Sequence, residues 1–310
     1  MIAFVFPGQG SQKVRMGQAL AEQLPESREA FEQADAALGT PLTTLCFEGP
    51  EDQLRLTENT QPALVAVSTA AARALGARGV RPDFVAGHSL GEYSAHVAAG
   101  TLGFGDALRT VRNRGRYMQE AVPVGEGAMA AILGLDADGV ATACDEAADG
   151  AVVSAANLNA PGQVVIAGAT AAVERAGARA KQLGARRVMP LPVSAPFHCA
   201  LMQPAQDRLA PELRGLVVAD PAVPVIANLD AEPKRDGASA VEALVAQVTA
   251  PVRWEQVVRR LASEGVDTYV EVGPGSVLSG LIRKIDREAR VMSVCDPDGV
   301  EQAVSALTSA

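Results

Sequence analysis

Short runs of β-branched and aromatic residues alternate along this chain with longer, alanine-rich stretches whose apolar residues recur at helical spacing. Glycine and proline bound many of the short runs, as expected for strands that end in turns. Strands that alternate with helices are joined by crossovers, which place the strands parallel in one sheet with helices on its faces. The chain is therefore predicted to be an α/β protein with a mainly parallel sheet.

Five short runs are predicted to form this sheet, and six longer segments are predicted to form helices around it. The strands are expected at Ile2 to Phe6, Phe84 to Gly87, Val223 to Asn228, Thr268 to Val272 and Arg290 to Val294. The helices are expected at Gln61 to Leu75, Leu90 to Ala99, Phe104 to Glu120, Val241 to Val248, Trp254 to Ser263 and Val277 to Ile285. We expect the resulting core to resemble an α/β-hydrolase-like domain.

The segment 125–193 has a different pattern of predicted elements, in the order strand, helix, strand, strand, helix, strand. The elements are expected at Ala128 to Leu133, Asp136 to Ala148, Ala151 to Asn157, Gln163 to Gly168, Ala171 to Leu183 and Arg186 to Leu191, with a turn over Asn159 to Gly162. This βαββαβ order is typical of a ferredoxin-like unit. With 310 residues the chain has room for such an insert, so we expect a discontinuous core of residues 1–124 and 194–310 around it.

The chain has 27 basic and 36 acidic residues, a formal net charge of −9. This balance argues against nucleic acid or an anionic membrane as the main partner, unless the basic residues gather on one face. The run from Met1 to Phe6 lacks the basic segment and the cleavage site of a signal peptide, so a buried strand is expected there. The longest apolar stretch, Pro62 to Leu75, is too short to cross a bilayer.

Four cysteines lie far apart and form no C-x-x-C pair, so they indicate neither a disulfide framework nor a metal site. Taken with the absence of a targeting or membrane segment, this predicts a cytoplasmic protein. The cysteines are Cys46, Cys144, Cys199 and Cys295.

Gly87-His88-Ser89-Leu90-Gly91 has the form G-x-S-x-G and lies between a predicted strand and a predicted helix. That context is typical of a nucleophile elbow, in which a tight turn lifts the serine hydroxyl to the carboxyl edge of the sheet. The amide of Leu90 would then face an oxyanion formed on an acyl group attached to Ser89. A simpler role is also open, because Ser89 followed by Glu92 matches the capping box S-x-x-E.

A serine hydroxyl needs a base, and the chain has only three histidines. His88 should point away from Ser89 at a tight turn and pack beside the strand. His96 follows Glu92 by four residues, which is more simply explained as a contact on the helix surface. His198 lies in a loop that re-enters the core, where the partner of an elbow serine is expected, so it is the best candidate for the base.

Two other features could carry different chemistry. Cys199 is a competing nucleophile, but no elbow or helix start surrounds it, so a small buried side chain is favoured. The turns Gly8-Gln9-Gly10 and Gly273-Pro274-Gly275 follow strands and yet lack the third glycine of the dinucleotide-binding fingerprint. Nucleotide binding is therefore disfavoured.

Several short motifs occur in order over nearly the whole chain. They are Phe6-Pro7-Gly8-Gln9-Gly10-Ser11-Gln12, Thr60-Gln61-Pro62-Ala63-Leu64, Gly87-His88-Ser89-Leu90-Gly91-Glu92, Arg114-Gly115 with Met118-Gln119, Asn157-Leu158-Asn159 with Pro161-Gly162-Gln163, Ser194 to His198, Pro251-Val252 with Trp254, and Glu271-Val272-Gly273-Pro274-Gly275. Each motif is weak alone, but the ordered set resembles the malonyl-CoA:acyl carrier protein transacylase family of fatty-acid synthesis.

This resemblance implies a transfer in two steps. Ser89 would take malonyl from coenzyme A as a serine ester, and the phosphopantetheine thiol of acyl carrier protein would remove it. His198 would act as base and acid, with a backbone carbonyl as its partner at the position that matches Gln247. The backbone amides of Gln9 and Leu90 would form the oxyanion hole. The resemblance implies no cofactor or metal, because the coenzyme A thioester is a substrate.

Four further residues match family positions that contact the substrate. Arg114 matches the arginine that holds the malonyl carboxylate, a task that suits a planar guanidinium, whereas most other arginines of this basic helix should be solvated. Phe197 resembles the residue type associated with malonyl rather than methylmalonyl substrates, because a large ring leaves no room for an α-methyl group. Gln61 and Asn159 match residues that line the pocket.

Three alternatives stay open. A free-standing acyltransferase that loads polyketide synthase carrier domains would carry the same motifs. A serine hydrolase is disfavoured by Arg114 and by the lack of an obvious acidic partner for Ser89 and His198. A noncatalytic module that binds carrier proteins is disfavoured because all three of these residues are present.

We expect the chain to be a monomer. The expected partner also sets a requirement for the surface charge of the chain. Carrier proteins of this kind are acidic, so a chain of net charge −9 needs a local basic surface to receive one. The candidates are Lys13, Arg15, Arg186, Arg187, Arg283, Lys284 and Arg287.

Overall fold

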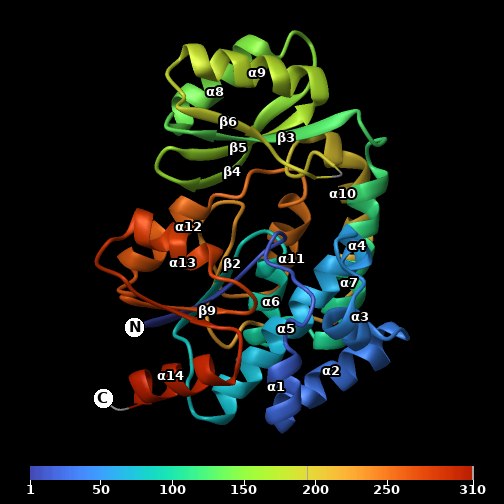
Figure 1. The fold of residues 1–310 in the computed structure, drawn as a ribbon, viewed down its shortest axis with the longest axis vertical. Coiled ribbons are helices and arrows are strands. Elements are labelled where there is room, and N and C mark those ends of the chain that lie inside the picture. The colour runs from blue at the N-terminus through green and yellow to red at the C-terminus, as the bar shows by residue number, and fades with distance from the viewer. Residues whose placement is uncertain (194, 309–310) are drawn as a thin grey trace.

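The computed structural model describes residues 1–193 and 195–308, and its larger sheet has six strands in the order β10-β9-β1-β2-β7-β8 (Figure 1). The strands are β1 (Ile2–Phe6), β2 (Phe84–Gly87), β7 (Val225–Ile226), β8 (Pro233–Lys234), β9 (Thr268–Val272) and β10 (Arg290–Val294). The first five in that order pair in parallel, and β8 pairs antiparallel with β7. The prediction of an α/β protein with a mainly parallel sheet is confirmed.

Alternate residues of the central strand β1 supply two apolar cores, one on each face of the sheet. Ala3 and Val5 pack with α12 (Trp254–Ser263) and α13 (Val277–Ile285). Phe4 and Phe6 pack on the other face. The helices on that face are α1 (Gln18–Gln23), α5 (Thr57–Ala77), α6 (Gly91–Ala98) and α14 (Pro297–Thr308). Because side chains of period two serve both cores, the strand is apolar throughout, and its residues from Ala3 to Phe6 are buried.

A further helical layer packs against α5 and forms the largest apolar cluster. It contains α2 (Pro25–Leu38), α3 (Leu42–Glu48), α4 (Glu51–Leu54), α7 (Phe104–Glu120), η1 (Ala200–Met202), α10 (Gln203–Arg214) and α11 (Gly237–Ala246). The sequence patterns did not predict the helices of residues 18–54, 203–214 and 297–308. The predicted strand Val223 to Asn228 is also too long, since only Val225 and Ile226 pair as β7.

Four strands form a second, antiparallel sheet in the order β4-β5-β3-β6. Its elements are β3 (Gly127–Leu133), α8 (Ala137–Ala147), β4 (Val153–Ala160), β5 (Gln163–Ala169), α9 (Thr170–Gln182) and β6 (Arg187–Pro190). α8 and α9 cover the face of this sheet that points away from the larger one (Figure 1). The element order matches the prediction, although β4 extends through Ala160 and shortens the expected turn.

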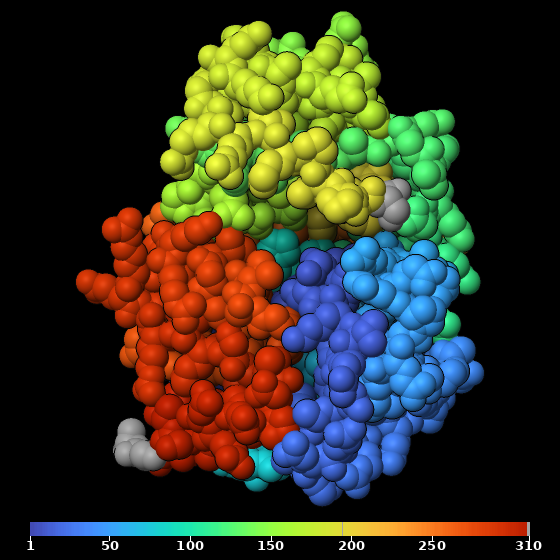
Figure 2. All heavy atoms as spheres, in the orientation of Figure 1, coloured from blue at the N-terminus to red at the C-terminus, as the bar shows by residue number. Residues whose placement is uncertain are grey.

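The two sheets meet beside the larger sheet's carboxyl edge. Val252, which precedes α12, donates its N–H to Ala156 O and accepts from Leu158 N, both at 2.8 Å. Lys284 of α13 also donates to the Gln163 side chain at 2.9 Å. Figure 2 shows a hollow between the green and yellow atoms of the second unit and the blue and red atoms below it.

One predicted boundary falls on a residue that the structure does not describe. Ser194, where the core was predicted to resume, lies outside the described residues. Within residues 1–193 and 195–308, none of the helices is both long and apolar enough to cross a membrane.

Candidate active site

Ser89 sits at the sharp turn between β2 and α6, with its backbone in the left-handed region at φ 52°. The turn requires glycine on both sides, because a Cβ on Gly87 would lie 1.9 Å from the carbonyl carbon of Gly91. A Cβ on Gly91 would in turn lie 2.0 Å from Phe6 O on β1. The G-x-S-x-G pattern thus lets strand, turn and helix approach closely, and it projects Ser89 from the sheet's carboxyl edge.

The Ser89 hydroxyl contacts functional side chains rather than the start of α6. Its Oγ lies 2.7 Å from His198 Nε2 and 3.3 Å from Arg114 Nη2. Leu90 is the N-cap residue of α6, and the helix has no side-chain capping hydrogen bond. The alternative of Ser89 as a simple helix cap is therefore wrong.

His198 is 3% exposed, and its Nδ1 lies 3.0 Å from the backbone carbonyl oxygen of Gln247. Because that carbonyl only accepts, Nδ1 carries the proton and the lone pair of Nε2 faces the Ser89 hydroxyl. Burial, together with the nearby positive charge of Arg114, lowers the pKa of His198 to about 3. The imidazole is therefore neutral at physiological pH and able to accept a proton.

This low pKa predicts an unusual pH profile for acylation of Ser89. A base with an ordinary histidine pKa would lose activity as the pH falls through about 6.5. With the pKa of His198 lowered to about 3, we expect the single-turnover acylation rate to stay flat down to about pH 5. Quenched-flow mass spectrometry between pH 5 and 8 measures this rate, and a midpoint near 6.5 would contradict the assignment.

The other two histidines lie elsewhere. His88 packs against the Trp254 ring and shares a 2.8 Å hydrogen bond between its Nε2 and Asn159 Oδ1, in agreement with its predicted packing beside the strand. The predicted surface contact between Glu92 and His96 is wrong, because both side chains are fully buried. Their helix α6 is covered by the sheet on one side and by α5 and α7 on the other.

Arg114 of α7 is fully buried beside Ser89, unlike the other arginines of the same helix, which are partly or largely exposed. Its guanidinium donates to Gln61 Oε1 and to Gln247 Oε1, both at 3.0 Å, and lies 5.5 Å from the Tyr93 ring centre. The guanidinium of Arg114 is therefore positioned by uncharged side-chain oxygens. In the described part of the chain, no carboxylate forms a salt bridge with it, so its charge is left for a carboxylate ligand.

The remaining predicted site residues surround this pair. Gln9 follows β1, and its Oε1 accepts from Gln61 Nε2 at 3.2 Å. Within residues 1–193 and 195–308, the backbone N–H groups of Gln9 and Leu90 donate to no protein acceptor, which leaves both able to bind an oxyanion. Phe197, 9% exposed, belongs to the large apolar cluster next to His198, while Asn159 reaches the site through His88.

Neither the role of Asn228 nor the burial of Glu92 was predicted from the sequence. Asn228 Oδ1 accepts from Ser89 N at 2.7 Å, and its Nδ2 donates to Gly87 O at 2.7 Å. Glu92 Oε2 accepts from Asn228 N at 2.9 Å and from Gln247 Nε2 at 2.8 Å. Burial raises the pKa of Glu92 to about 7. The position of Asn228 at the end of a predicted parallel strand was an available signal, because such ends share one edge.

Two features lie apart from this chemistry. Cys199 is buried and donates to Pro196 O at 3.1 Å, and burial raises the pKa of its thiol to about 11, so it is the inert side chain that was predicted.

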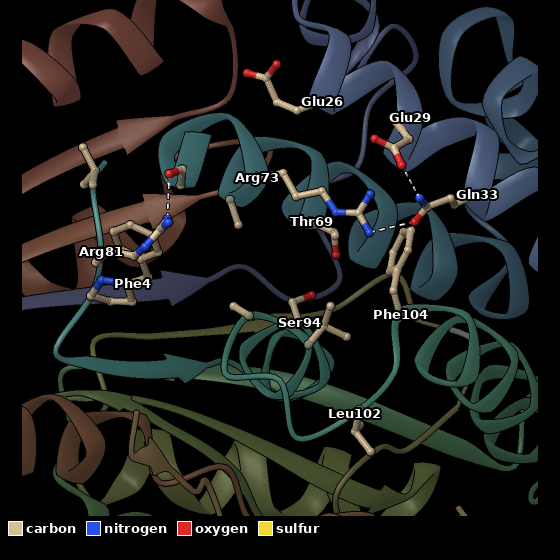
Figure 3. Close-up of a pocket in the computed structure, with 16 residues that line it drawn as sticks. Phe4, Glu26, Glu29, Gln33, Thr69, Arg73, Arg81, Ser94, Leu102 and Phe104 are labelled. Atoms are coloured by element: carbon tan, nitrogen blue, oxygen red, sulfur yellow. Dashed lines mark hydrogen bonds between the residues drawn. The ribbon is translucent and has the colours of Figure 1, made fainter. Parts of the chain in front are cut away.

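A cavity of about 640 Å³ lies among α2, α5 and α6, with Thr69 and Ser94 extending into it (Figure 3). None of the residues named around Ser89 lines that cavity.

Comparison with known proteins gives matches over essentially the whole chain. The acyl transferase domain family matches residues 3–302. A malonyl CoA-acyl carrier protein transacylase of Bacillus subtilis is 49% identical over 99% of this chain and 97% of its own, and that of Escherichia coli K12 is 50% identical over 97% and 98%.

Solved structures agree with the sequence comparison. The malonyl CoA-acyl carrier protein transacylase of Coxiella burnetii superposes with a TM-score of 0.97 at 44% identity, covering 99% of this chain and 98% of that one. A malonyl-transacylase solved in complex with a type II polyketide synthase acyl-carrier protein superposes with a TM-score of 0.96 at 46% identity, covering 98% and 99%. In both comparisons the sequence identity is well above what two proteins that share only a fold would need.

Proposed function

The chain belongs to the acyl transferase domain family, and on that premise we propose that it transfers malonyl from malonyl-CoA to the thiol of acyl carrier protein through an ester on Ser89. One observation carries the proposal: the Ser89 hydroxyl lies within 2.7 Å of a neutral imidazole nitrogen and 3.3 Å from a buried guanidinium. A nucleophile and a carboxylate-binding group are thus placed to act on the two ends of one malonyl group.

In the first half-reaction, Ser89 Oγ attacks the thioester carbonyl while His198 Nε2 takes its proton. The tetrahedral intermediate then expels coenzyme A, whose sulfur receives that proton from His198. The ester of malonate with Ser89 remains. The Gln247 carbonyl, which accepts from Nδ1, stabilises the transient imidazolium in the place of a triad aspartate.

The second half-reaction runs through the same groups in reverse. The phosphopantetheine thiol gives its proton to His198 and attacks the ester carbonyl, and the proton returns to Ser89 Oγ as the ester bond breaks. In both halves the amides of Gln9 and Leu90 would receive the negative oxygen. This chemistry uses side chains, backbone amides and the two thiols, so it calls for no cofactor or metal.

Arg114 would hold the free carboxylate of the malonyl group with two parallel hydrogen bonds. Gln61 fixes one of its terminal nitrogens at 3.0 Å and would line the pocket beside it. Phe197 would exclude an α-methyl group, and Asn159 would border the entrance from the antiparallel sheet. These assignments rest on the burial of Arg114 and on its distance to Ser89.

The pathway has two candidates, of which fatty-acid synthesis is the first. Loading of a polyketide synthase carrier is the second, because the malonyl-transacylase in complex with a type II polyketide synthase carrier is 46% identical to this chain. The relative rates at which the two kinds of carrier are loaded would discriminate between them. Either carrier is acidic, so we propose that it docks on a local basic surface, for which the candidates are Lys13, Arg15, Arg186, Arg187, Arg283, Lys284 and Arg287.

The finer description of the fold is part of the same proposal. We assign residues 1–124 and 194–310 to an α/β-hydrolase-like core and residues 125–193 to a ferredoxin-like insert. The strand order β4-β5-β3-β6 with α8 and α9 on one face supports the latter assignment. We further propose a cytoplasmic monomer that binds neither nucleic acid nor membrane, in keeping with a net charge of −9.

The function is tested by the intact mass of the protein after incubation with malonyl-CoA alone. We expect the protein to gain one malonyl group and to lose it again when phosphopantetheinylated carrier protein is added, with malonyl then found on the carrier. Direct loading of the carrier without a malonyl-enzyme would contradict the two-step mechanism. Release of free malonate as fast as transfer would instead favour the serine hydrolase.

A further inference from the structure

We propose that Glu92 is a positioning residue of this site, whose buried carboxylate fixes the Gln247 side chain against Arg114 and, through Asn228, fixes the backbone of Ser89. The inference rests on the proposed function, because it concerns how the malonyl-binding arginine and the nucleophile are held. Glu92 touches neither reacting atoms nor the expected substrate carboxylate. Its effect would pass through two neighbours.

The first connection sets the orientation of the Gln247 carboxamide. Its Nε2 donates to Glu92 Oε2 at 2.8 Å and to Ser89 O at 3.0 Å, while its Oε1 accepts from Arg114 Nη2 at 3.0 Å. Were the amide turned over, its NH₂ group would face the guanidinium, and two donors would oppose each other. An acceptor at position 92 therefore selects the orientation that holds Arg114.

This connection also explains how a fully buried guanidinium is kept without a direct ion pair. The hydrogen-bond partners of Arg114 in the described chain are Gln61, Gln247 and Ser89, all of them neutral oxygens. A carboxylate in direct contact would occupy the donors that the malonyl carboxylate needs. Glu92 is separated from Arg114 by the Gln247 amide, so it orients a partner of the arginine and leaves the remaining guanidinium donors to the substrate.

The second connection reaches the nucleophile. Glu92 Oε2 accepts from Asn228 N at 2.9 Å, and the Asn228 side chain bonds to Ser89 N and Gly87 O, both at 2.7 Å. These bonds clamp the turn on both sides of a residue whose φ of 52° is uncommon outside glycine. Loss of the carboxylate would leave Asn228 N unpaired in a buried place and loosen that clamp.

The test compares Glu92→Ala and Glu92→Gln by kcat and KM for malonyl-CoA and acetyl-CoA. Acetyl has no carboxylate, so the ratio of the two kcat/KM values reports the placement of Arg114. We expect Glu92→Ala to lower the malonyl-to-acetyl ratio at least about tenfold, since it leaves buried donors unsatisfied. Glu92→Gln should restore the ratio to within about threefold of the wild type, because its amide oxygen still accepts both N–H groups.

A matched control is Glu271, another fully buried carboxylate, which accepts from the backbone N–H groups of Leu278 and Ser279. Glu271→Ala should lower the melting temperature and leave the malonyl-to-acetyl ratio unchanged. A folded Glu92→Ala protein with the wild-type ratio would overturn the proposal and leave Glu92 a structural residue only.

If Glu92→Ala does not fold, Gln247→Leu tests the same connection, because it removes the carboxamide and keeps the backbone carbonyl that holds His198. A drop in the ratio of about tenfold is expected there as well, and an unchanged ratio would overturn the proposal. The wild-type protein distinguishes failure of this inference from failure of the proposed function. A wild type that forms no malonyl ester would refute the proposed function, whatever the variants do.

Discussion

The Ser89→Ala protein is expected to gain no covalent mass with malonyl-CoA and to transfer malonyl at least about 10⁴-fold more slowly than the wild type, because loss of an enzyme nucleophile costs rates of this order. The change removes only the hydroxyl. The backbone hydrogen bonds of Ser89, from its N–H to Asn228 and from Gln247 and Glu92 N to its carbonyl, remain available. The fold should therefore persist, and intact mass together with a carrier-loading assay measures the effect.

Ser94→Ala is the matched control for this experiment. Ser94 lies in α6, five residues after Ser89, is 2% exposed and extends into the cavity of Figure 3, which His198 does not line. Its variant should be labelled and should transfer malonyl like the wild type. Persistent labelling of the Ser89→Ala protein would show that another residue is the nucleophile.

Arg114→Ala is expected to lower kcat/KM for malonyl-CoA by about 10²- to 10³-fold, because truncating one partner of a buried charged pair costs about 2–5 kcal/mol and about 1.4 kcal/mol is a factor of ten. Acetyl-CoA lacks the carboxylate, so its use should fall far less. Arg114→Lys should give an intermediate loss, since an ammonium group keeps the charge and loses the planar pair of donors. Steady-state kinetics with both thioesters measures the difference.

The control for Arg114 comes from the same helix. Arg109 is exposed and forms a salt bridge with Asp106 three residues earlier, an arrangement that contributes little at the surface. Arg109→Ala should leave both thioester activities unchanged. Equal losses with malonyl-CoA and acetyl-CoA in Arg114→Ala would mean that this guanidinium does not bind the carboxylate.

The sequence carried enough information to predict the elbow because its determinants are local. A strand, a turn that tolerates only glycine at two positions and a helix follow one another within residues 84–98. The choice of His198 needed only a short list of three histidines and a loop that returns to the sheet edge. Its place 2.7 Å from Ser89 agrees with that choice.

Burial of Glu92 and His96 could not be predicted in the same way. Their spacing of four residues places them on one helix face, and a local pattern does not say whether that face meets water or a second layer of protein. Here α5 and α7 form that layer against α6, and although helices were predicted at both places, nothing in their local patterns shows that they pack there. From the sequence pattern alone, which does not show this layer, a carboxylate and an imidazole on one helix face are expected at the surface.

The exact ends of α11 could not be predicted from the sequence either. The apolar spacing predicted a helix from Val241 to Val248, which would place Gln247 inside it. The helix instead begins at Gly237, where the Asp236 side chain accepts from Ser239 N, and it ends at Ala246. Gln247 follows directly, so its carbonyl is not taken up by a further helical turn and can accept from His198.

The order in which this site is completed follows from where its parts lie in the chain. Ser89 and His198 are 109 residues apart in sequence, and His198 and Gln247 a further 49. A growing chain therefore presents its serine long before the base, and the base before the carbonyl that orients it. Contacts of such long range form only as the chain reaches its final topology. The nucleophile, the base and the carbonyl therefore come together only in the folded chain, and a partly folded chain lacks the assembled site.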